Sequence, residues 1–229
     1  IGEDEALLIA DRYDVWKFSP DGKKIENLTK GEGRRTGVQY RIIDLGRRND
    51  PYLYQNIQSF PKKGKLYLTT FGEETSENGY AVANIAKPSV PQGFTDKWSF
   101  SSTVKAKDAG TIAYLKGNFR NPMNLHITRD EWKTAECLTD LNRQQDGYLW
   151  GDVQMVRWTS YDGTPLKGLL YTPENLDASR KYPMMIYFYE KNSETLYNYI
   201  QPAPSRSIIN IPFYVSRGYV VFVPDIVYK

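Results

Sequence analysis

The chain has 229 residues, of which 40% are hydrophobic and 25% are charged, a balance typical of folded globular domains rather than of disordered tails. Its 30 Lys and Arg residues against 27 Asp and Glu residues give a net charge of +3. A charge this small predicts neither nucleic acid nor an anionic membrane as the main partner. One Cys and one His exclude an internal disulfide and a Cys-rich zinc site.

No run of about 18 apolar residues occurs, so the sequence predicts no membrane-spanning helix. The longest apolar stretch, Gly218 to Pro224, has the length of a strand. The chain begins at Ile1 without a signal-peptide pattern and stops at Lys229 directly after a strand pattern. We therefore expect it to be a piece of a longer protein, whose compartment is not revealed by these ends.

Two segments of the first two thirds repeat one another over a long separation in the chain. Residues 14–29 align without a gap with residues 124–139, and a Lys, a Glu, a Leu and a Thr recur in register. Each copy predicts a strand, a polar turn and a second strand, with the turns at Pro20–Gly22 and Arg129–Glu131.

A shorter match joins Gly64–Thr69 to Gly110–Leu115, and Ala6–Ala10 resembles an earlier copy. Units of roughly 40–50 residues with several short strands are typical of β-propeller blades. Because one blade cannot bury both faces of its sheet, we expect further blades outside this chain. The alternative is an all-β sandwich whose hairpins are alike by chance. The strand patterns form three units, near residues 6–29, 65–95 and 111–139.

The pattern changes near residue 148. Apolar residues alternate on both sides of Asp162-Gly163, which predicts a hairpin from Val153 to Pro173. The run Tyr182–Tyr189 is apolar on both faces, as expected for a buried strand inside a covered sheet.

A short helix and a second buried strand are predicted next. Asn210 is suited to cap the helix, with Pro212 in its first turn and Gly218 just past its end. Tyr219–Asp225 has the pattern of a buried strand. The order hairpin, strand, helix, strand predicts the opening of an α/β fold, with the strands that end at Tyr189 and Asp225 side by side and parallel.

Propeller blades that run into such an α/β segment resemble the prolyl oligopeptidase family of serine peptidases. The dipeptidyl-peptidase-IV-like branch, whose members cleave after the second residue of a peptide, is the most similar. The resemblance implies a mixed fold: residues 1–147 are the last blades of a β-propeller, and residues 148–229 are the N-terminal segment of an α/β-hydrolase domain. The residues that carry it are Val156–Gly163, Leu166–Pro173, Lys181–Tyr189 and Arg217–Asp225.

The resemblance also implies a Ser, Asp and His triad, with the Ser on a Gly-x-Ser-x-Gly turn. That motif is absent, and the one histidine, His126, lies in a predicted blade strand. The nucleophile, acid and base are therefore expected beyond Lys229, and the chain alone is expected to be inert. The intact parent would hydrolyse short peptides by acyl transfer to Ser. No metal or organic cofactor is implied.

One catalytic residue of the family falls inside the chain. By resemblance Tyr189, which closes the first buried strand of the hydrolase portion, supplies a hydroxyl to the oxyanion hole. A phenol at a rigid strand end can donate to the developing negative oxygen without bringing a charge of its own. A tyrosine that merely packs at a strand end is the alternative.

Two departures from the family pattern concern the neighbours of these strand ends. Glu190–Ser193 follows Tyr189 where members place small, Gly-containing residues, and Asp225 is followed by Ile226–Tyr228 rather than by a nearby Arg-Gly. These differences put the shape of the loop and the substrate class in doubt more than the fold.

Other polar residues are predicted to have structural roles. Glu73-Glu74 is similar to a pair that binds substrate amino termini in dipeptidyl peptidases, but its place in a polar turn favours solvation. Cys137 is expected to be a small buried residue, and His126 a packed or half-exposed strand residue. Neither Ser160 nor Ser193 lies near a histidine or on a nucleophile turn, so neither is expected to be a nucleophile.

The partners implied by the resemblance are a peptide substrate of the intact parent and the rest of its propeller and hydrolase domain. The oligomeric state is unknown. Bacterial peptidases of this type are often exported to the periplasm, but the compartment stays unknown. A non-enzymatic β-propeller that binds partners and a catalytically dead hydrolase homologue are the alternatives. A further antiparallel blade over residues 153–225 would favour the binding module.

Overall fold

The computed structural model describes residues 5–43, 45, 60–204 and 206–227 and consists mostly of β-strands with few helices. Ile1, Tyr228 and Lys229 lie outside the described residues. Two compact units are present: Ile1–Leu115 with Leu125–Cys137, and Lys116–Asn124 with Leu138–Lys229. The predicted change from propeller to hydrolase between residues 147 and 148 stays a prediction.

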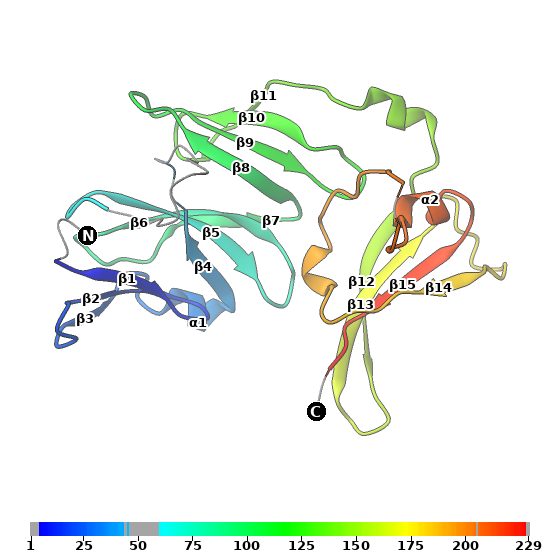
Figure 1. The fold of residues 1–229 in the computed structure, drawn as a ribbon, viewed down its shortest axis with the longest axis horizontal. Helices are drawn as coiled ribbons and strands as arrows, with labels where there is room; N and C mark the ends of the chain where they lie inside the picture. The colour runs from blue at the N-terminus through cyan, green and yellow to red at the C-terminus, as the bar shows by residue number, and fades with distance from the viewer. Residues whose placement is uncertain (1–4, 44, 46–59, 205, 228–229) are drawn as a thin grey trace. The chain divides into compact units, whose positions relative to one another are not determined.

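The first unit contains three sheets whose strands neighbour one another in chain order (Figure 1). Short connections join neighbouring strands, as expected for blades, except that β4 and β5 are separated in the chain by residues 43–64. The first sheet has β1 (Leu7–Ala10), β2 (Val15–Phe18) and β3 (Ile25–Asn27). The second has β4 (Val38–Ile42), β5 (Lys65–Gly72), β6 (Asn78–Asn84) and β7 (Gln92–Asp96). The third has β8 (Ser99–Lys105), β9 (Ile112–Gly117), β10 (Asn124–Thr128) and β11 (Glu136–Cys137).

The longer sequence repeat corresponds to the same strand pairing in its two copies. In the first sheet Trp16 is opposite Asn27, and in the third His126 is opposite Cys137. In the ungapped alignment of residues 14–29 with 124–139, these two pairs occupy the same positions. The hairpin prediction is therefore confirmed for both copies. In the first copy, Gly22 has a φ of 70° and its N–H donates to the carbonyl of Ser19, which closes the turn.

Neighbouring sheets of the first unit pack face to face through shared apolar clusters. Val15 and Leu28 pack with Leu66 and Leu68 of the second sheet. A second cluster joins the second and third sheets around Tyr80, which is 1% exposed. The two strands of the shorter match bury equivalent positions, since Leu66 and Leu68 in β5 correspond to Ile112 and Tyr114 in β9, and all four are buried.

Tyr80 is the centre of the second cluster. Its ring stacks on Trp132 with centroids 4.3 Å apart and meets Phe94, Phe100 and Tyr114 edge-on. Its hydroxyl lies 2.6 Å from the hydroxyl of Thr103, and burial raises the pKa of Tyr80 to about 12. One side chain thus links strands of two sheets.

Several features of the first unit differ from the predictions. Strands β4 and β8 and the short helix α1 (Glu32–Thr36) were not anticipated. The third predicted strand unit, near residues 111–139, ends with β11 at Cys137. The expectation that Cys137 is buried is wrong: β11 is a two-residue strand at the edge of its sheet, and the Cys137 side chain is exposed.

The second unit is built on one mixed sheet with the strand order β12-β13-β15-β14 (Figure 1). The predicted hairpin around Asp162-Gly163 is confirmed by the pairing of its first two strands. The strands are β12 (Asp152–Thr159), β13 (Pro165–Thr172), β14 (Met184–Ile186) and β15 (Val220–Pro224). The helices are the 3-10 turns η1 (Arg143–Gly147) and η2 (Ser193–Thr195) and helix α2 (Ile211–Val215).

Strands β14 and β15 are parallel, with Met185 opposite Val221. Helix α2 lies between them in the chain, and the Asn210 side chain accepts a hydrogen bond from the Phe213 N–H at 3.2 Å, as the capping pattern predicts. The predicted parallel crossover is confirmed. A further antiparallel blade over residues 153–225 is excluded.

The expectation of a buried strand over residues 182–189 is wrong in length and in exposure. Strand β14 covers only three residues, and Met184, Ile186 and Phe188 are 55–62% exposed. The reason is that, among the described strands, β14 pairs only with β15, and the apolar core of this unit covers one face of the sheet. Strand β15 is buried as predicted, with Val221 at 0%.

Candidate functional site

Tyr189 lies on an exposed bend beyond the end of β14. The last ladder bond joins the Tyr187 N–H to the carbonyl of Phe222 at 3.0 Å, two residues before Tyr189. Tyr189 itself is 71% exposed. Its backbone carbonyl accepts a hydrogen bond from the side-chain amide of Asn192 at 2.8 Å. The backbone of Tyr189 is therefore held by a hydrogen bond, whereas its side chain lies outside the apolar core.

The chain turns directly after Tyr189. Glu190 adopts a φ of 50°, the left-handed region that favours glycine and that costs other residues about 1–2 kcal/mol. The carbonyl of Glu190 accepts a hydrogen bond from the Ile226 N–H at 2.8 Å, which holds this turn against the chain after β15. The tight turn is thus made without the Gly-containing sequence of the resembled family.

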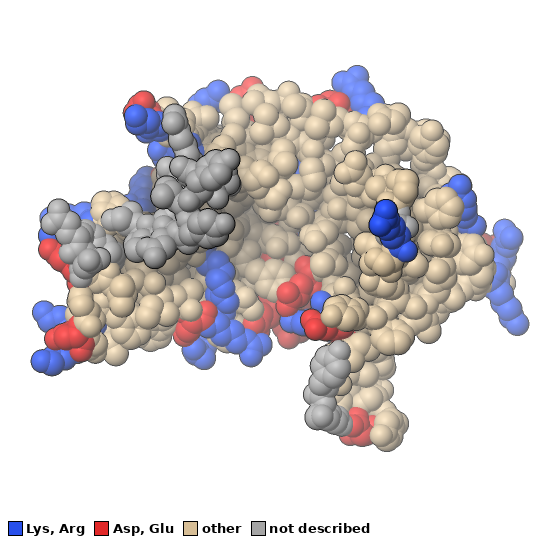
Figure 2. Space-filling model, viewed as in Figure 1, with Lys and Arg blue, Asp and Glu red and all other residues tan. Residues whose placement is uncertain are grey.

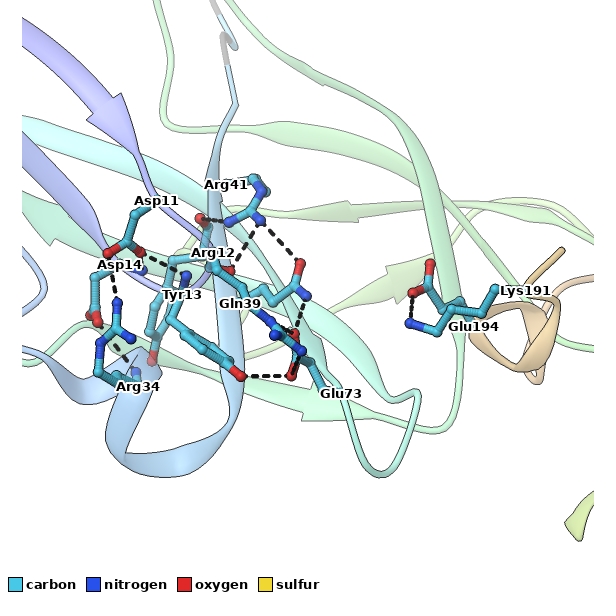
Figure 3. Close-up of polar contacts among 11 residues, drawn as sticks. Asp11, Arg12, Tyr13, Asp14, Arg34, Gln39, Arg41, Glu73, Lys191 and Glu194 are labelled. Carbon is cyan, nitrogen blue, oxygen red and sulfur yellow. Dashed lines mark hydrogen bonds and ion pairs between the residues drawn. The ribbon is translucent and has the colours of Figure 1, made fainter. Parts of the chain in front are cut away.

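The Asp225 carboxylate anchors the rest of this turn. It is 9% exposed and accepts from the backbone N–H groups of Asn192 and Ser193 at 2.7 and 2.8 Å and from the Ser193 hydroxyl at 2.5 Å. Ser193 is fully buried, so its hydroxyl is committed to this contact. An exposed ion pair, Lys191 with Glu194, crosses the same turn (Figure 3).

An open hollow of about 1470 Å³ lies elsewhere on the second unit. Its lining includes Trp150 and Tyr199, whose parallel rings are 5.9 Å apart, together with Phe213 and Arg217. Neither Tyr189 nor Asp225 is among its lining residues, so this hollow takes no part in the contacts of the turn.

Glu73, expected in a solvated turn, instead lies at the centre of a polar network in the first unit (Figure 3). Its carboxylate accepts from the Arg12 guanidinium at 2.7 and 2.9 Å, from the Tyr13 hydroxyl at 2.8 Å and from the Gln39 amide at 2.6 Å. The Glu73 side chain is only 17% exposed. The bonds from Arg12, and then those from Tyr13 and Gln39, lower the pKa of Glu73 to about 2 despite partial desolvation. The expectation of solvation is wrong for Glu73, whereas Glu74 is exposed.

The same network continues around Tyr13. The guanidinium carbons of Arg12 and Arg34 lie 5.2 and 5.4 Å from the centroid of its ring. Arg34 also donates to Asp11 at 2.9 Å. Asp14, 1% exposed, accepts from the Thr29 hydroxyl at 2.6 Å. The bonds of Arg12 and Tyr13 to Glu73 connect the loop after β1 with the turn after β5. They therefore hold two sheets together rather than leaving a carboxylate open for a ligand.

Replacing Glu73 by Gln is expected to destabilise the folded protein by roughly 1–2 kcal/mol at pH 7, because Gln cannot accept from all of these donors. The carboxylate has a folded pKa of about 2 against its usual value of 4.5. Its contribution is therefore present above about pH 4.5 and is lost as the pH falls towards 2. Urea unfolding of both proteins between pH 7 and pH 3 measures the difference in unfolding free energy, which should shrink as the pH falls.

The matched control is Glu74→Gln at the exposed neighbouring position, which should change the unfolding free energy by less than about 0.5 kcal/mol. A Glu73→Gln penalty that stays constant down to pH 3 contradicts the role given to the ionised carboxylate.

The remaining polar residues have structural contacts. His126 is half-buried and stacks on Tyr114 at 5.7 Å, in agreement with the prediction. The Ser160 hydroxyl bonds to Asp162 within the β12–β13 turn. Among the described residues, no three metal-ligating side chains gather in one place. No helix in the described part of the chain is long and apolar enough to cross a bilayer. On the face in Figure 2, acidic and basic side chains occur in small mixed groups.

Sequence reasoning missed the hydrogen bonds of two carboxylates, Asp225 and Glu73. Asp225 was noted only as a strand end, although the end of a buried strand next to a crossover is where polar groups converge in α/β sheets. Nothing local to Glu73 indicates its partners, since Arg12, Tyr13 and Gln39 lie 34 to 61 residues away in the sequence.

No family model matches the chain, and no curated protein matches it by sequence. Solved structures do match its fold, and several of them are peptidases. The resemblance to the prolyl oligopeptidase family is therefore confirmed at the level of the fold.

Three of these structures illustrate the similarity. Dipeptidyl peptidase 4 of Porphyromonas gingivalis matches with a TM-score of 0.62 and 12% identity over 96% of this chain and 28% of that one. An acylaminoacyl peptidase of Pyrococcus horikoshii has a TM-score of 0.57 and 15% identity over 96% and 30%. A post-proline cleaving enzyme of Rickettsia typhi has a TM-score of 0.59 and 12% identity over 97% and 31%. The chain thus spans about 30% of the length of each of these three structures.

Proposed function

We propose that this chain is the last part of a β-propeller and the opening of an α/β-hydrolase domain in a serine peptidase of the prolyl oligopeptidase type. The observation that carries the proposal is the change in sheet construction along the chain. Three sheets have their strands in chain order, and the fourth has a crossover and a parallel pair, β14 with β15. The similar solved peptidases support the same assignment.

The reaction of the whole protein is then hydrolysis of short peptides by acyl transfer to a serine. The Ser, Asp and His of the triad come from residues outside this chain, so the chain alone is inert. The exposed apolar residues of β14 and the bend after it, Met184, Ile186 and Phe188, support the need for a covering segment from the rest of the domain.

Tyr189 is the residue of this chain that takes part in the chemistry. In the proposal its hydroxyl donates to the oxygen of the attacked carbonyl, where negative charge develops in the transition state. Its position past the end of β14, at the end of a parallel strand, supports this role because a donor must be held where the charge forms. The phenol is neutral, so it needs no charged partner in the site.

A fluorophosphonate probe, which labels activated serines, tests the proposal. The full-length protein should be labelled at one serine in a Gly-x-Ser-x-Gly sequence, and the 229-residue chain should stay unlabelled because it has no such motif. Heat-denatured full-length protein is the control for unspecific reaction. Stoichiometric labelling of the 229-residue chain, for example at Ser160 or Ser193, would refute the proposal. A full-length protein that stays unlabelled would favour the catalytically dead homologue.

A further inference from the structure

The turn after Tyr189 has almost no apolar support of its own. Phe188, Tyr189 and Glu190 are all exposed, and β14 ends three residues before Tyr189. A donor to a developing charge must nevertheless keep its place, since the gain depends on a hydrogen bond of ordinary length in the transition state. Something other than packing has to hold this backbone.

The hydrogen bonds of the turn converge on the residues directly after β15. The Asp225 carboxylate binds the N–H groups of Asn192 and Ser193 and the Ser193 hydroxyl, and the Ile226 N–H binds the carbonyl of Glu190. Asn192 in turn donates its side-chain amide to the carbonyl of Tyr189. A short path of hydrogen bonds therefore runs from the Asp225 carboxylate through Asn192 to the backbone of Tyr189.

The Asp225 carboxylate suits this task better than a neutral side chain. It is nearly buried, and the hydrogen bonds that it accepts are charge-assisted, hence shorter and stronger than neutral ones. Ser193 is fully buried, so a change of the carboxylate that it contacts would weaken buried hydrogen bonds and would force the turn to move.

We propose that Asp225 is a positioning residue that fixes the Tyr189 hydroxyl for catalysis. This inference rests on the proposed function of Tyr189. Asp225 acts only through the turn Glu190–Ser193 and touches no substrate. The conformation of the turn, and with it the alignment of the donor, depends on the carboxylate at the end of the neighbouring parallel strand.

The test is a double-mutant cycle in the full-length protein, with kcat and KM measured on a short peptide substrate. Asp225→Asn is expected to lower kcat by about 10- to 100-fold, since a misplacement of about 1 Å can cost roughly 100-fold, and to leave KM nearly unchanged. In a Tyr189→Phe background the same change should lower kcat no further, because the donor that it positions is already gone. Asp177→Asn, at an exposed aspartate of the same unit, is the matched control and should leave kcat unchanged.

The outcomes separate the two ideas. If Tyr189→Phe lowers kcat but Asp225→Asn does not, or if the two losses multiply in the double variant, the positioning role is wrong and the proposed function stands. If Tyr189→Phe leaves kcat unchanged, the proposed role of Tyr189 fails first. Hydrogen exchange gives an independent readout: Asp225→Asn should speed exchange at Asn192 and Ser193, and Tyr189→Phe should not.

Should Asp225→Asn not fold, Ser193→Ala replaces it in the cycle. This variant removes only the hydroxyl that donates to Asp225 and keeps both backbone donors. It should give a smaller loss of kcat that likewise disappears in the Tyr189→Phe background. An unchanged kcat in Ser193→Ala, with Tyr189→Phe impaired, overturns the positioning role.

Discussion

On the proposed function, replacing Tyr189 by Phe is expected to lower the kcat of the full-length protein by about 100- to 1000-fold, the typical loss when one oxyanion donor is removed. The substitution removes a single oxygen and keeps the ring, so the fold should be unaffected. In the proposed role the hydroxyl interacts with an oxygen that becomes negative only in the transition state, so KM should change little. Steady-state kinetics on a short peptide substrate measures both constants.

Tyr161→Phe is the matched control for this prediction. Tyr161 lies in the same unit, in the turn between β12 and β13, and is fully exposed. Its substitution should leave both constants unchanged. A Tyr189→Phe enzyme with a normal kcat, or with a raised KM and an unchanged kcat, contradicts the role of the hydroxyl as a donor to the transition state.

Tyr80→Ala is expected to destabilise the first unit by about 3–5 kcal/mol, the range for truncation of a buried aromatic ring. Tyr80 is 1% exposed and contacts four other aromatic rings, among them Trp132 of the turn between β10 and β11. Its loss opens a cavity at the contact between two sheets. A loss of this size is a large part of the stability of an ordinary domain, so a partly unfolded protein at about 37 °C is expected. Urea unfolding followed by near-ultraviolet circular dichroism measures the change.

Tyr80→Phe separates the ring from the hydroxyl. It removes only the contact with the Thr103 hydroxyl, at an expected cost of about 0.5–1.5 kcal/mol. If Tyr80→Ala costs no more than Tyr80→Phe, the ring does not hold the two sheets together in the way that its contacts suggest.

The sequence predicted those parts of the fold that short-range patterns encode. The hairpin at Asp162-Gly163 and the helix capped by Asn210 follow from residues within one turn of each other, and both are present. The repeat of residues 14–29 in 124–139 predicted equivalent strand pairs, because the same spacing imposes the same register. The parallel pair β14 and β15 followed from the apolar runs around one helix.

The predictions that failed concern contacts between different sheets and strands at the edge of a sheet. An apolar run does not reveal how many neighbours a strand has, so the exposed edge strand β14 was expected to be buried. Strand β8 was missed because several of its residues are polar and exposed and give little contrast. Glu73 was placed in solvent because its partners come from distant loops.

For the candidate site, Tyr189 was predicted only through the resemblance to a family. The residues that hold its turn in place were not predicted. The bonds from Asp225 to Asn192 and Ser193 join residues 33 and 32 positions apart. A contact between residues so far apart in the chain leaves no periodic pattern in the sequence. The left-handed Glu190 was likewise unforeseen, because few residues other than Gly, Asn and Asp adopt that conformation.

The strand order β12-β13-β15-β14 has a consequence for the order of assembly. Strand β14 leaves a ribosome before β15, yet its only sheet neighbour among the described strands is β15. The hairpin β12–β13 can form from local contacts as soon as its residues have been synthesised. Strand β14 can pair only after residues 220–224 have been synthesised and have docked against β13. The segment that carries Tyr189 is therefore expected to be the last part of this sheet to acquire its native place.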